Sequence, residues 1–500
     1  MKTKITAIIT LILTLASCVS VPKDAVQSNA PVNMYPDYAD VTIPQNIAPL
    51  NFLIRDNAVT AVCVTVNGET MYSGSGSEVN FDQGEWRDML KSNVGKNLDV
   101  QVFTEADGKW TAWKKFQWTV APEPVDAYLT YRLIEPDYEV FNNLQIQERC
   151  VENFDVRNIS DYKHTPGRCM NCHTYASQSP DLSMLYVRGE GGGAILNQGG
   201  KLSKLNIKTD DMVSGSVYFG FHPSGRYITF SSNVIVPTFH SEASKRMEVV
   251  DQVSDVYALD LETDEIIRSP LLADSLYFET FPAFSPDGKF IYYCSSPRIT
   301  RTDQLEELQY SLCRLPFSDG KIGETVDTIY SASRNHHSVC HPRISPDGRF
   351  LVFTEADYGT FPIWHRESDL AIIDLKAMAA NDSTKAVNDS TKAANDSTKA
   401  AASMAKANSD QSDTYHSWSS NSRWLVFASK RDDGLYGKPY FTYIDAQGIA
   451  HKPFVLPQAH PQFYDNCLKS FNAPELGTGP LPFSADDVAK AIEQPYINVK

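Results

Sequence analysis

The sequence predicts an all-β protein in two parts, a small N-terminal β-sandwich and a larger array of repeated β-sheets. Three observations support this prediction. Short runs of alternating apolar and polar residues are frequent, and 11% of the 500 residues are aromatic. Stretches with a helical period are almost absent. A ten-residue pattern with a tight turn recurs through the second half of the chain.

The first residues predict export and a lipid anchor. Lys2 and Lys4 precede an apolar run at 5–15 that is too short to span a bilayer, so residues 1–17 are predicted to be a signal peptide. The small residues before Cys18 resemble the lipobox of bacterial lipoproteins, which implies that Cys18 is acylated. The alternative is an ordinary signal peptide with an incidental cysteine. No later segment is apolar enough to cross a membrane, so we expect an anchored protein rather than an integral one.

The next segments predict a tether, a sandwich and a connector. Residues 18–40 are polar and contain proline, as a tether does. Residues 41–122 alternate short strands with turn signals such as Asn67-Gly68, which is typical of a small Ig-like β-sandwich. A Pro-Glu-Pro sequence marks its end, and residues 123–165 are predicted to form a connector.

A strand–turn–strand pattern is repeated along the rest of the chain. In its clearest copy, Pro286-Asp287-Gly288 supplies the turn: proline presets φ, aspartate bonds back to the backbone, and glycine takes a positive φ. A further strand follows each copy. From the clearest to the faintest, the copies occupy residues 284–293, 344–353, 221–230, 418–427 and 178–187.

This repeat resembles that of TolB-like β-propeller lipoproteins of the Bacteroidetes type, in the WD40-like PD40 class. The resemblance implies a β-propeller over residues 166–475, with four-stranded sheets stacked radially. Five copies are visible, and the connector with the C-terminal segment offers a sixth blade, so five or six blades are expected. Residues 476–500 are predicted to be a C-terminal tail. The alternative, an open stack of hairpins, would leave strand edges exposed.

An insertion interrupts one repeat at residues 379–412. It contains three near-identical copies of Asn-Asp-Ser-Thr-Lys-Ala, and such polar sequence without an apolar seam predicts a disordered surface loop. The Asp-Ser-Thr triplets resemble the O-glycosylation signal of Bacteroidetes secreted proteins. The resemblance implies sugars near Ser383, Ser390 and Ser397.

Residues 169–173 have the C-x-x-C-H spacing of c-type haem attachment. Cys169 and Cys172 would add to the two porphyrin vinyl groups, and His173 would bind the iron as its proximal ligand. Export agrees with this prediction, because cytochrome c assembly takes place outside the bacterial cytoplasm. The alternatives are a structural disulfide and half of a zinc site, but the sequence has no second cysteine pair at zinc-ribbon spacing. The expected cofactor is one covalent haem c.

Two histidines are candidates for the sixth iron ligand. The haem motif falls where the innermost strand of the first blade is expected, near the central funnel of a propeller. In the register of the repeat, His341 aligns with Phe281 and His416 with Pro282. Most loop histidines bind no metal. Of these two candidates, we rank His341 first and His416 second. A methionine ligand is the alternative.

Six further cysteines are unassigned. Cys294 and Cys313 lie on successive predicted strands and form the first pair to test for a disulfide, which an oxidising compartment permits. Buried free thiols are the alternative.

These features predict a lipid-anchored c-type cytochrome of the bacterial envelope that exchanges electrons with a redox partner protein. We expect it at the outer membrane, on the periplasmic or surface side. The net charge of −16 argues against nucleic-acid binding. Two alternatives remain open: an interaction protein with a structural or sensory haem, and a haem-dependent oxidoreductase or peroxidase. For the latter, Glu279, Asp357 and Arg431 are candidate acid–base residues.

Overall fold

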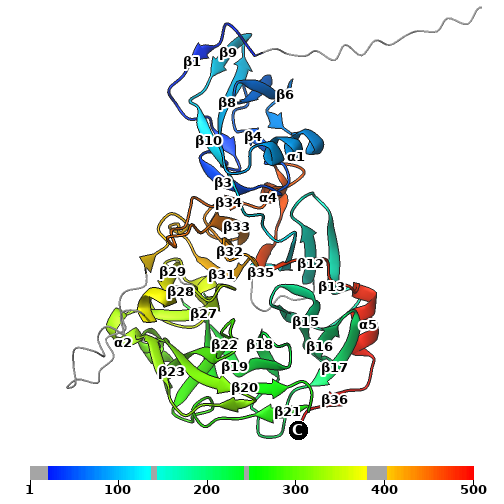
Figure 1. Ribbon diagram of the computed structural model, residues 1–500, viewed down its shortest axis with the longest axis vertical. Helices are drawn as coiled ribbons and strands as arrows, with labels where there is room; N and C mark the ends of the chain where they lie inside the picture. The colour runs from blue at the N-terminus through cyan, green and yellow to red at the C-terminus, as the bar shows by residue number, and fades with distance from the viewer. Residues whose placement is uncertain (1–20, 137–142, 241–246, 380–401) are drawn as a thin grey trace, which may run out of the picture.

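The protein consists of two β-rich units, one standing on the other (Figure 1). The computed structural model describes residues 21–136, 143–240, 247–379 and 402–500. Cys18 with the signal peptide, and the predicted sugar-bearing Ser383, Ser390 and Ser397, lie outside the described residues. Within the described ranges, no helix is both long and apolar enough to cross a membrane.

The N-terminal unit contains a seven-stranded sheet and a three-stranded sheet. Its strands are β1 (Val26–Gln27), β2 (Met34–Tyr35), β3 (Val41–Pro44), β4 (Phe52–Ile54), β5 (Ala61–Val66), β6 (Glu69–Ser75), β7 (Glu78–Val79), β8 (Asn97–Ala106), β9 (Lys109–Ala112) and β10 (Phe116–Ala121). The larger sheet has the order β1-β9-β8-β10-β3, with β5 paired to β8 and β6 to β5, and the smaller has the order β2-β4-β7.

One helix, α1 (Gln83–Ser92), completes the core of this unit. It begins at Asp82, whose side chain accepts hydrogen bonds from the first backbone N–H groups. Trp86 on α1 and Trp118 on β10 are both fully buried, with ring centroids 5.3 Å apart in an edge-on contact. This aromatic pair joins the helix to the larger sheet.

The prediction that residues 18–40 form a tether is wrong for the described part of this segment. From Val26 onward the chain is built into the N-terminal unit, because β1 pairs with β9 and β2 pairs with β4. Tyr38 is fully buried there. Polar composition misled the prediction, since the few apolar side chains of this segment provide its packing.

The larger unit contains six sheets, each built on four antiparallel strands. The first sheet is formed by β11 (Tyr128–Ile134), β12 (Gln145–Cys150), β13 (Val156–Asp161) and β35 (Ser470–Gly477). The second is formed by β14 (Met170–Ala176), β15 (Ser179–Val187), β16 (Gly193–Gln198) and β17 (Lys201–Asn206), and β36 (Ile497–Asn498) pairs with β17. The third is formed by β18 (Ser216–Phe221), β19 (Tyr227–Phe239), β20 (Met247–Asp260) and β21 (Glu265–Ile267).

The other three sheets follow in sequence order. The fourth sheet is formed by β22 (Tyr277–Phe284), β23 (Phe290–Pro297), β24 (Ser311–Ser318) and β25 (Lys321–Ile322), and β26 (Asp327–Tyr330) also pairs with β24. The fifth is formed by β27 (Ser338–Ile344), β28 (Phe350–Ala356), β29 (Asp369–Asp374) and β30 (Ala402–Ser403). The sixth is formed by β31 (Asp413–Trp418), β32 (Trp424–Ser429), β33 (Lys438–Tyr443) and β34 (Phe454–Val455). Short helical segments lie between strands: η1 (Thr302–Glu307), α2 (Ala332–Asn335), η2 (Pro362–Trp364) and α4 (Phe463–Asn466).

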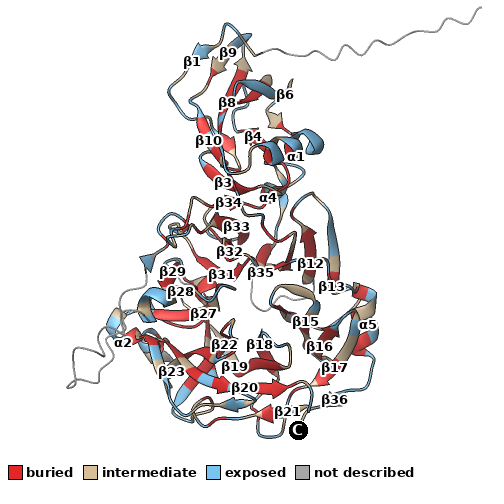
Figure 2. Ribbon diagram, viewed as in Figure 1, coloured by how far each residue is buried: buried red, intermediate tan, exposed pale blue. Residues whose placement is uncertain are grey.

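One edge strand of each sheet faces a common centre. These six strands, β14, β18, β22, β27, β31 and β35, contact one another in that order, and β35 also contacts β14. Burial follows the sheets, as Figure 2 shows, and Phe230, Phe353 and Phe427 on the second strands are fully buried. The all-β prediction is confirmed, and the inner strands surround a central space.

The turns of the repeat have the predicted conformation. Gly288 and Gly348 have φ of 71° and 72°. In the turn before Gly288, the Ser285 hydroxyl donates to the Asp287 carboxylate at 2.6 Å, and that carboxylate accepts the Lys289 backbone N–H at 3.1 Å.

Three other segments differ from the expected boundaries. The connector at 123–165 is not a separate segment, because its strands pair with β35 in one sheet. The tail at 476–500 carries helix α5 (Ala485–Ile492) and β36, which pairs with β17. The insertion at 379–412 ends in packed structure, where Met404 is buried. In each case, apolar side chains pack against residues from distant parts of the chain.

The proposed Cys294–Cys313 disulfide is wrong. All eight described cysteines are free, and these two are buried. In the ladder between β23 and β24, Cys294 is opposite Leu312 while Cys313 is opposite Tyr293. Neighbouring positions in a strand point to opposite faces of the sheet, so the two thiols point away from each other.

Candidate functional site

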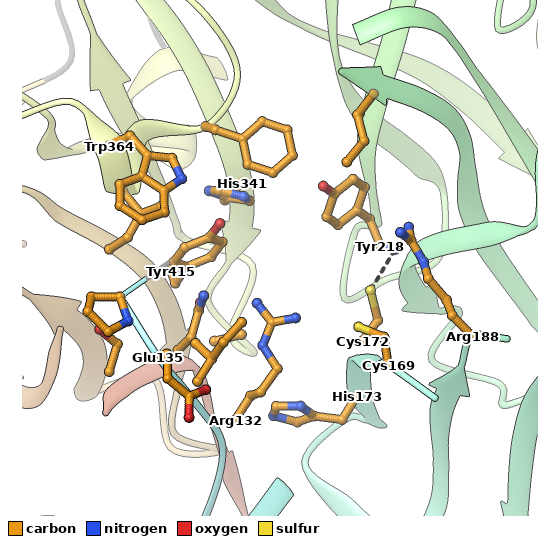
Figure 3. A pocket seen from close by; sticks show the side chains of 18 of the residues that line it. Arg132, Glu135, Cys169, Cys172, His173, Arg188, Tyr218, His341, Trp364 and Tyr415 are labelled. Atoms are coloured by element: carbon orange, nitrogen blue, oxygen red, sulfur yellow. Dashed lines mark hydrogen bonds between the residues drawn. The ribbon is translucent and has the colours of Figure 1, made fainter. Parts of the chain in front are cut away.

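A cavity of about 580 Å³ lies among the inner strands of the larger unit (Figure 3). It brings together four of the five residues predicted to hold the cofactor: Cys169, Cys172, His173 and His341. In Figure 3 the two cysteines lie on one side of the space and His341 on the other. The cavity therefore combines distant parts of the sequence whose chemistry was predicted separately.

The haem motif reaches the cavity because β14 is an inner strand. The ladder between β14 and β15 shifts register between Met170 and His173, so the strand bulges at the motif. The backbone N–H of Tyr218 points at the Cys172 sulfur, 3.5 Å away. Burial raises the pKa of the Cys172 thiol. Both Cys169 and Cys172 are free and border the cavity.

His173 is a half-buried imidazole whose two ring nitrogens are themselves buried. Neither ring nitrogen makes a hydrogen bond of normal geometry, although the backbone of Thr130 and of Ala473 lies nearby. Burial, together with the charge of Arg132, lowers the pKa of His173 to about 4. The imidazole is therefore neutral, the form that binds metals.

His341 belongs to a series of equivalent aromatic residues. Four inner strands bulge at the same point, and the first bulged residue in each has a positive φ: Tyr218 (53°), Phe281 (51°), His341 (54°) and Tyr415 (49°). Their rings contact in series, with centroids 4.5, 4.3 and 4.6 Å apart. Positive φ is uncommon outside glycine, and here it presents one ring from each strand to the centre.

The two candidate sixth ligands differ in their surroundings. His341 is half-buried, and its Nδ1 has no hydrogen-bond partner among the described residues. His416 is buried, and its Nδ1 also lacks such a partner, but its Nε2 donates to the Val352 carbonyl at 2.9 Å. His416 lines a second cavity of about 400 Å³. In the ring of inner strands, β27 with His341 is the third strand from β14 in either direction. His341 is therefore across the centre from the haem motif.

The three candidate acid–base residues lie elsewhere. None of them is among the described residues that line either cavity. Glu279 is buried, and desolvation and nearby Asp255 raise its pKa to about 8. Arg431 forms an ion pair with Asp413 at 2.9 Å, and Asp357 is exposed beside His337. Sequence register alone could not place their side chains.

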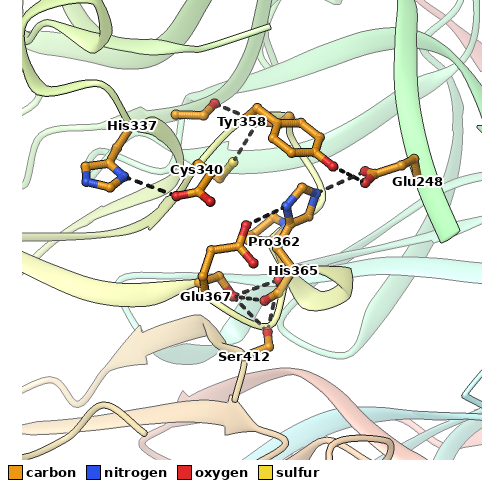
Figure 4. Close-up of polar contacts among 12 residues, drawn as sticks. Glu248, His337, Cys340, Tyr358, Pro362, His365, Glu367 and Ser412 are labelled. Atoms are coloured by element: carbon orange, nitrogen blue, oxygen red, sulfur yellow. Dashed lines mark hydrogen bonds and ion pairs between the residues drawn. The ribbon is translucent and has the colours of Figure 1, made fainter. Parts of the chain in front are cut away.

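A buried polar cluster supports the wall that carries Trp364 (Figure 4). His365, which follows Trp364, is 1% exposed and lies between two carboxylates, with Nε2 3.0 Å from Glu248 and Nδ1 3.0 Å from Glu367. The Tyr358 hydroxyl donates to Glu248 at 2.7 Å. Glu248 belongs to β20, so the cluster ties the long β19–β20 hairpin to the cavity wall. No sequence motif indicated this network.

The described ranges hold no group of three or more His, Cys, Asp and Glu side chains that could bind a metal ion. A haem requires only axial protein ligands, since the porphyrin supplies the other four. The free cysteines, the orphaned nitrogens of His173 and the size of the cavity fit such a group.

Comparisons with known proteins find only weak similarity. No protein-family model matches the sequence, and no curated protein matches it. A prolyl endopeptidase structure aligns with a TM-score of 0.34 and 15% identity, over 67% of this chain and 42% of the other. Prolyl oligopeptidase B from Galerina marginata gives 0.33 and 10%, over 71% and 42%. An oligogalacturonate lyase in complex with manganese gives 0.27 and 10%, over 55% and 73%.

This chain thus spans about two fifths of the prolyl peptidase structures that it matches.

Proposed function

We propose that this chain is a c-type cytochrome of the cell envelope, with one covalent haem c in the central cavity and electron transfer as its function. The observation that carries the proposal is the meeting of Cys169, Cys172, His173 and His341 in one cavity. We further propose that the six sheets are the blades of a TolB-like propeller, which the order of contacts among the inner strands supports.

The four residues that line the cavity would hold the haem. Cys169 and Cys172 would form the thioether bonds to the porphyrin, His173 would bind the iron as its proximal ligand, and His341 would be the sixth ligand. Bound haem c supplies a reversible one-electron couple. Acylated Cys18 anchors the protein, and a redox partner protein in the envelope exchanges the electron.

The haem proposal is tested by co-expressing the full chain with a cytochrome c maturation system. A pyridine haemochrome spectrum should show a covalent c-type haem in the wild type, and Cys172→Ala should lose one thioether bond or all covalent haem. Cys467→Ala is the matched control, because Cys467 is also a half-buried free thiol but lies outside both cavities. A colourless wild type, or an unchanged spectrum in Cys172→Ala, would overturn the proposal.

A further inference from the structure

The central cavity is positively charged although the protein as a whole is acidic. The net charge of the chain is −16. The described lining nevertheless contains four cationic side chains, Arg132, Arg188, Arg343 and Lys430, and a single carboxylate, Glu135. A concave, partly desolvated wall with charge of one sign concentrates ions of the opposite sign. The contrast with the rest of the molecule indicates an anionic occupant.

Lys430 is the strongest element of this wall. It is only 6% exposed, and its Nζ lies 4.4 Å from the centre of the Trp364 ring. Among the described residues, this ammonium has no hydrogen-bond acceptor and no carboxylate within ion-pair distance, although the charge of Asp433 acts on it from farther away. A buried charge without such a partner costs free energy, so sequences rarely keep one without a use.

Arg343 adds a second cation at the centre. It lies on β27, two residues after His341, and lines both the 580 Å³ and the 400 Å³ cavity. Its guanidinium makes no hydrogen bond or close ion pair with the described part of the chain, although its charge acts on Glu475, which also lines the smaller cavity. Guanidinium groups bind carboxylates and oxyanions through two parallel N–H donors.

We infer that Lys430 and Arg343 form a binding site for a carboxylate or small oxyanion in the central cavity. The Trp364 ring lies against the Lys430 ammonium and orients it. The other arginines of the lining, Arg132 and Arg188, add to the positive charge of the cavity. Two sources supply this chemistry: a propionate group of the bound haem, or a free small anion that enters beside it. The first source rests on the proposed haem function, whereas the site itself depends only on residues of this chain.

The test uses the purified full chain with and without haem, the latter expressed without the maturation system. Acetate and inorganic phosphate are the probes, titrated at constant ionic strength by calorimetry and by the rise in Tm that a ligand of the folded state produces. Lys430→Met and Arg343→Met keep side-chain volume and remove the charge. Lys289→Met is the control, because Lys289 is an exposed lysine that lines neither cavity.

Each outcome decides the inference. We expect the haem-free wild type to bind a probe, with at least tenfold weaker binding in Lys430→Met and no change in Lys289→Met. If the haem-loaded protein no longer responds, the propionate is the occupant; if it still responds, a free anion is. No response from wild type in either form, or an undiminished response in Lys430→Met and Arg343→Met, would overturn the site. Haem attachment is read separately by the haemochrome, so its failure cannot be mistaken for this one.

Discussion

The ring of His341 lies against the ring of Tyr415, with centroids 4.6 Å apart, and both residues occupy the bulge of an inner strand with positive φ. Phe281, at the equivalent bulge of β22, also contacts the His341 ring. The repeat thus presents one side chain from each of these strands at the centre, and the identity of that residue decides the local chemistry. Of the four strands β18, β22, β27 and β31, only β27 has a histidine at this position.

Replacing His341 should change the spin state of the haem. In the haem-loaded protein, His341→Ala removes the imidazole across from the haem motif, so we expect a six-coordinate low-spin spectrum to become high-spin. His416→Ala is the matched control, because the Nε2 of His416 is held by the Val352 carbonyl. Optical and electron paramagnetic resonance spectra provide the measurement. A low-spin His341→Ala protein, or a high-spin His416→Ala protein, would contradict the assignment of His341.

The repeat made much of this arrangement predictable from the sequence. Aligning the Pro-Asp-Gly turns already places His341 at the position of Phe281, and the structure puts both at equivalent bulges. The cavity charge was not predictable in this way. Lys430 follows β32 and Arg132 lies on β11, so no local pattern connects them. They meet only because the sheets are arranged around one centre.

The turn glycines allow a matched test of packing. Gly288 and Gly348 have nearly the same positive φ, so alanine at either position should cost about 1 kcal/mol in backbone strain. A Cβ at Gly288 would also lie 2.1 Å from Nε2 of His222, whereas no atom lies within 4 Å of one at Gly348. The His222 ring is held by Phe284 and Phe317.

We therefore expect Gly288→Ala to lower the free energy of unfolding by about 1–3 kcal/mol more than Gly348→Ala does. Urea denaturation of both variants measures the difference. Equal losses would show that the His222 ring can move aside.

The cysteines of the fourth sheet in sequence order provide a redox test. Because Cys294 and Cys313 point to opposite faces of the β23–β24 ladder, a reductant should leave the Tm unchanged. Alkylation of the unfolded protein without reductant, followed by mass spectrometry, should label both thiols. A fall in Tm with reductant, accompanied by protection of both thiols, would contradict the free pair.

The Glu248–His365 contact should make stability depend on pH. Burial opposes charge on His365, but the hydrogen bonds that it donates to the Glu248 and Glu367 carboxylates outweigh this effect and raise the pKa of His365 to about 9. Although burial also opposes charge on Glu248, its contacts with His365 lower the pKa of this carboxyl. The histidine's contribution is complete below its ordinary pKa of 6.5 and is lost as the pH rises through about 9. The carboxylate's contribution is lost as the pH falls below about 4.5.

The contribution of this pair to stability should therefore be greatest between about pH 5 and 7. One pKa unit corresponds to about 1.4 kcal/mol, so between pH 6.5 and 9 the wild type should lose about 3 kcal/mol relative to His365→Gln, which cannot take up a proton. Urea denaturation of both proteins across this range measures the difference, and His337→Gln is the control because His337 is exposed and lies 3.9 Å from its carboxylate partner. If wild type and His365→Gln lose stability in parallel above pH 7, the imidazole is not held in its charged form. In that case the wall carrying Trp364 depends on packing rather than on this ion pair.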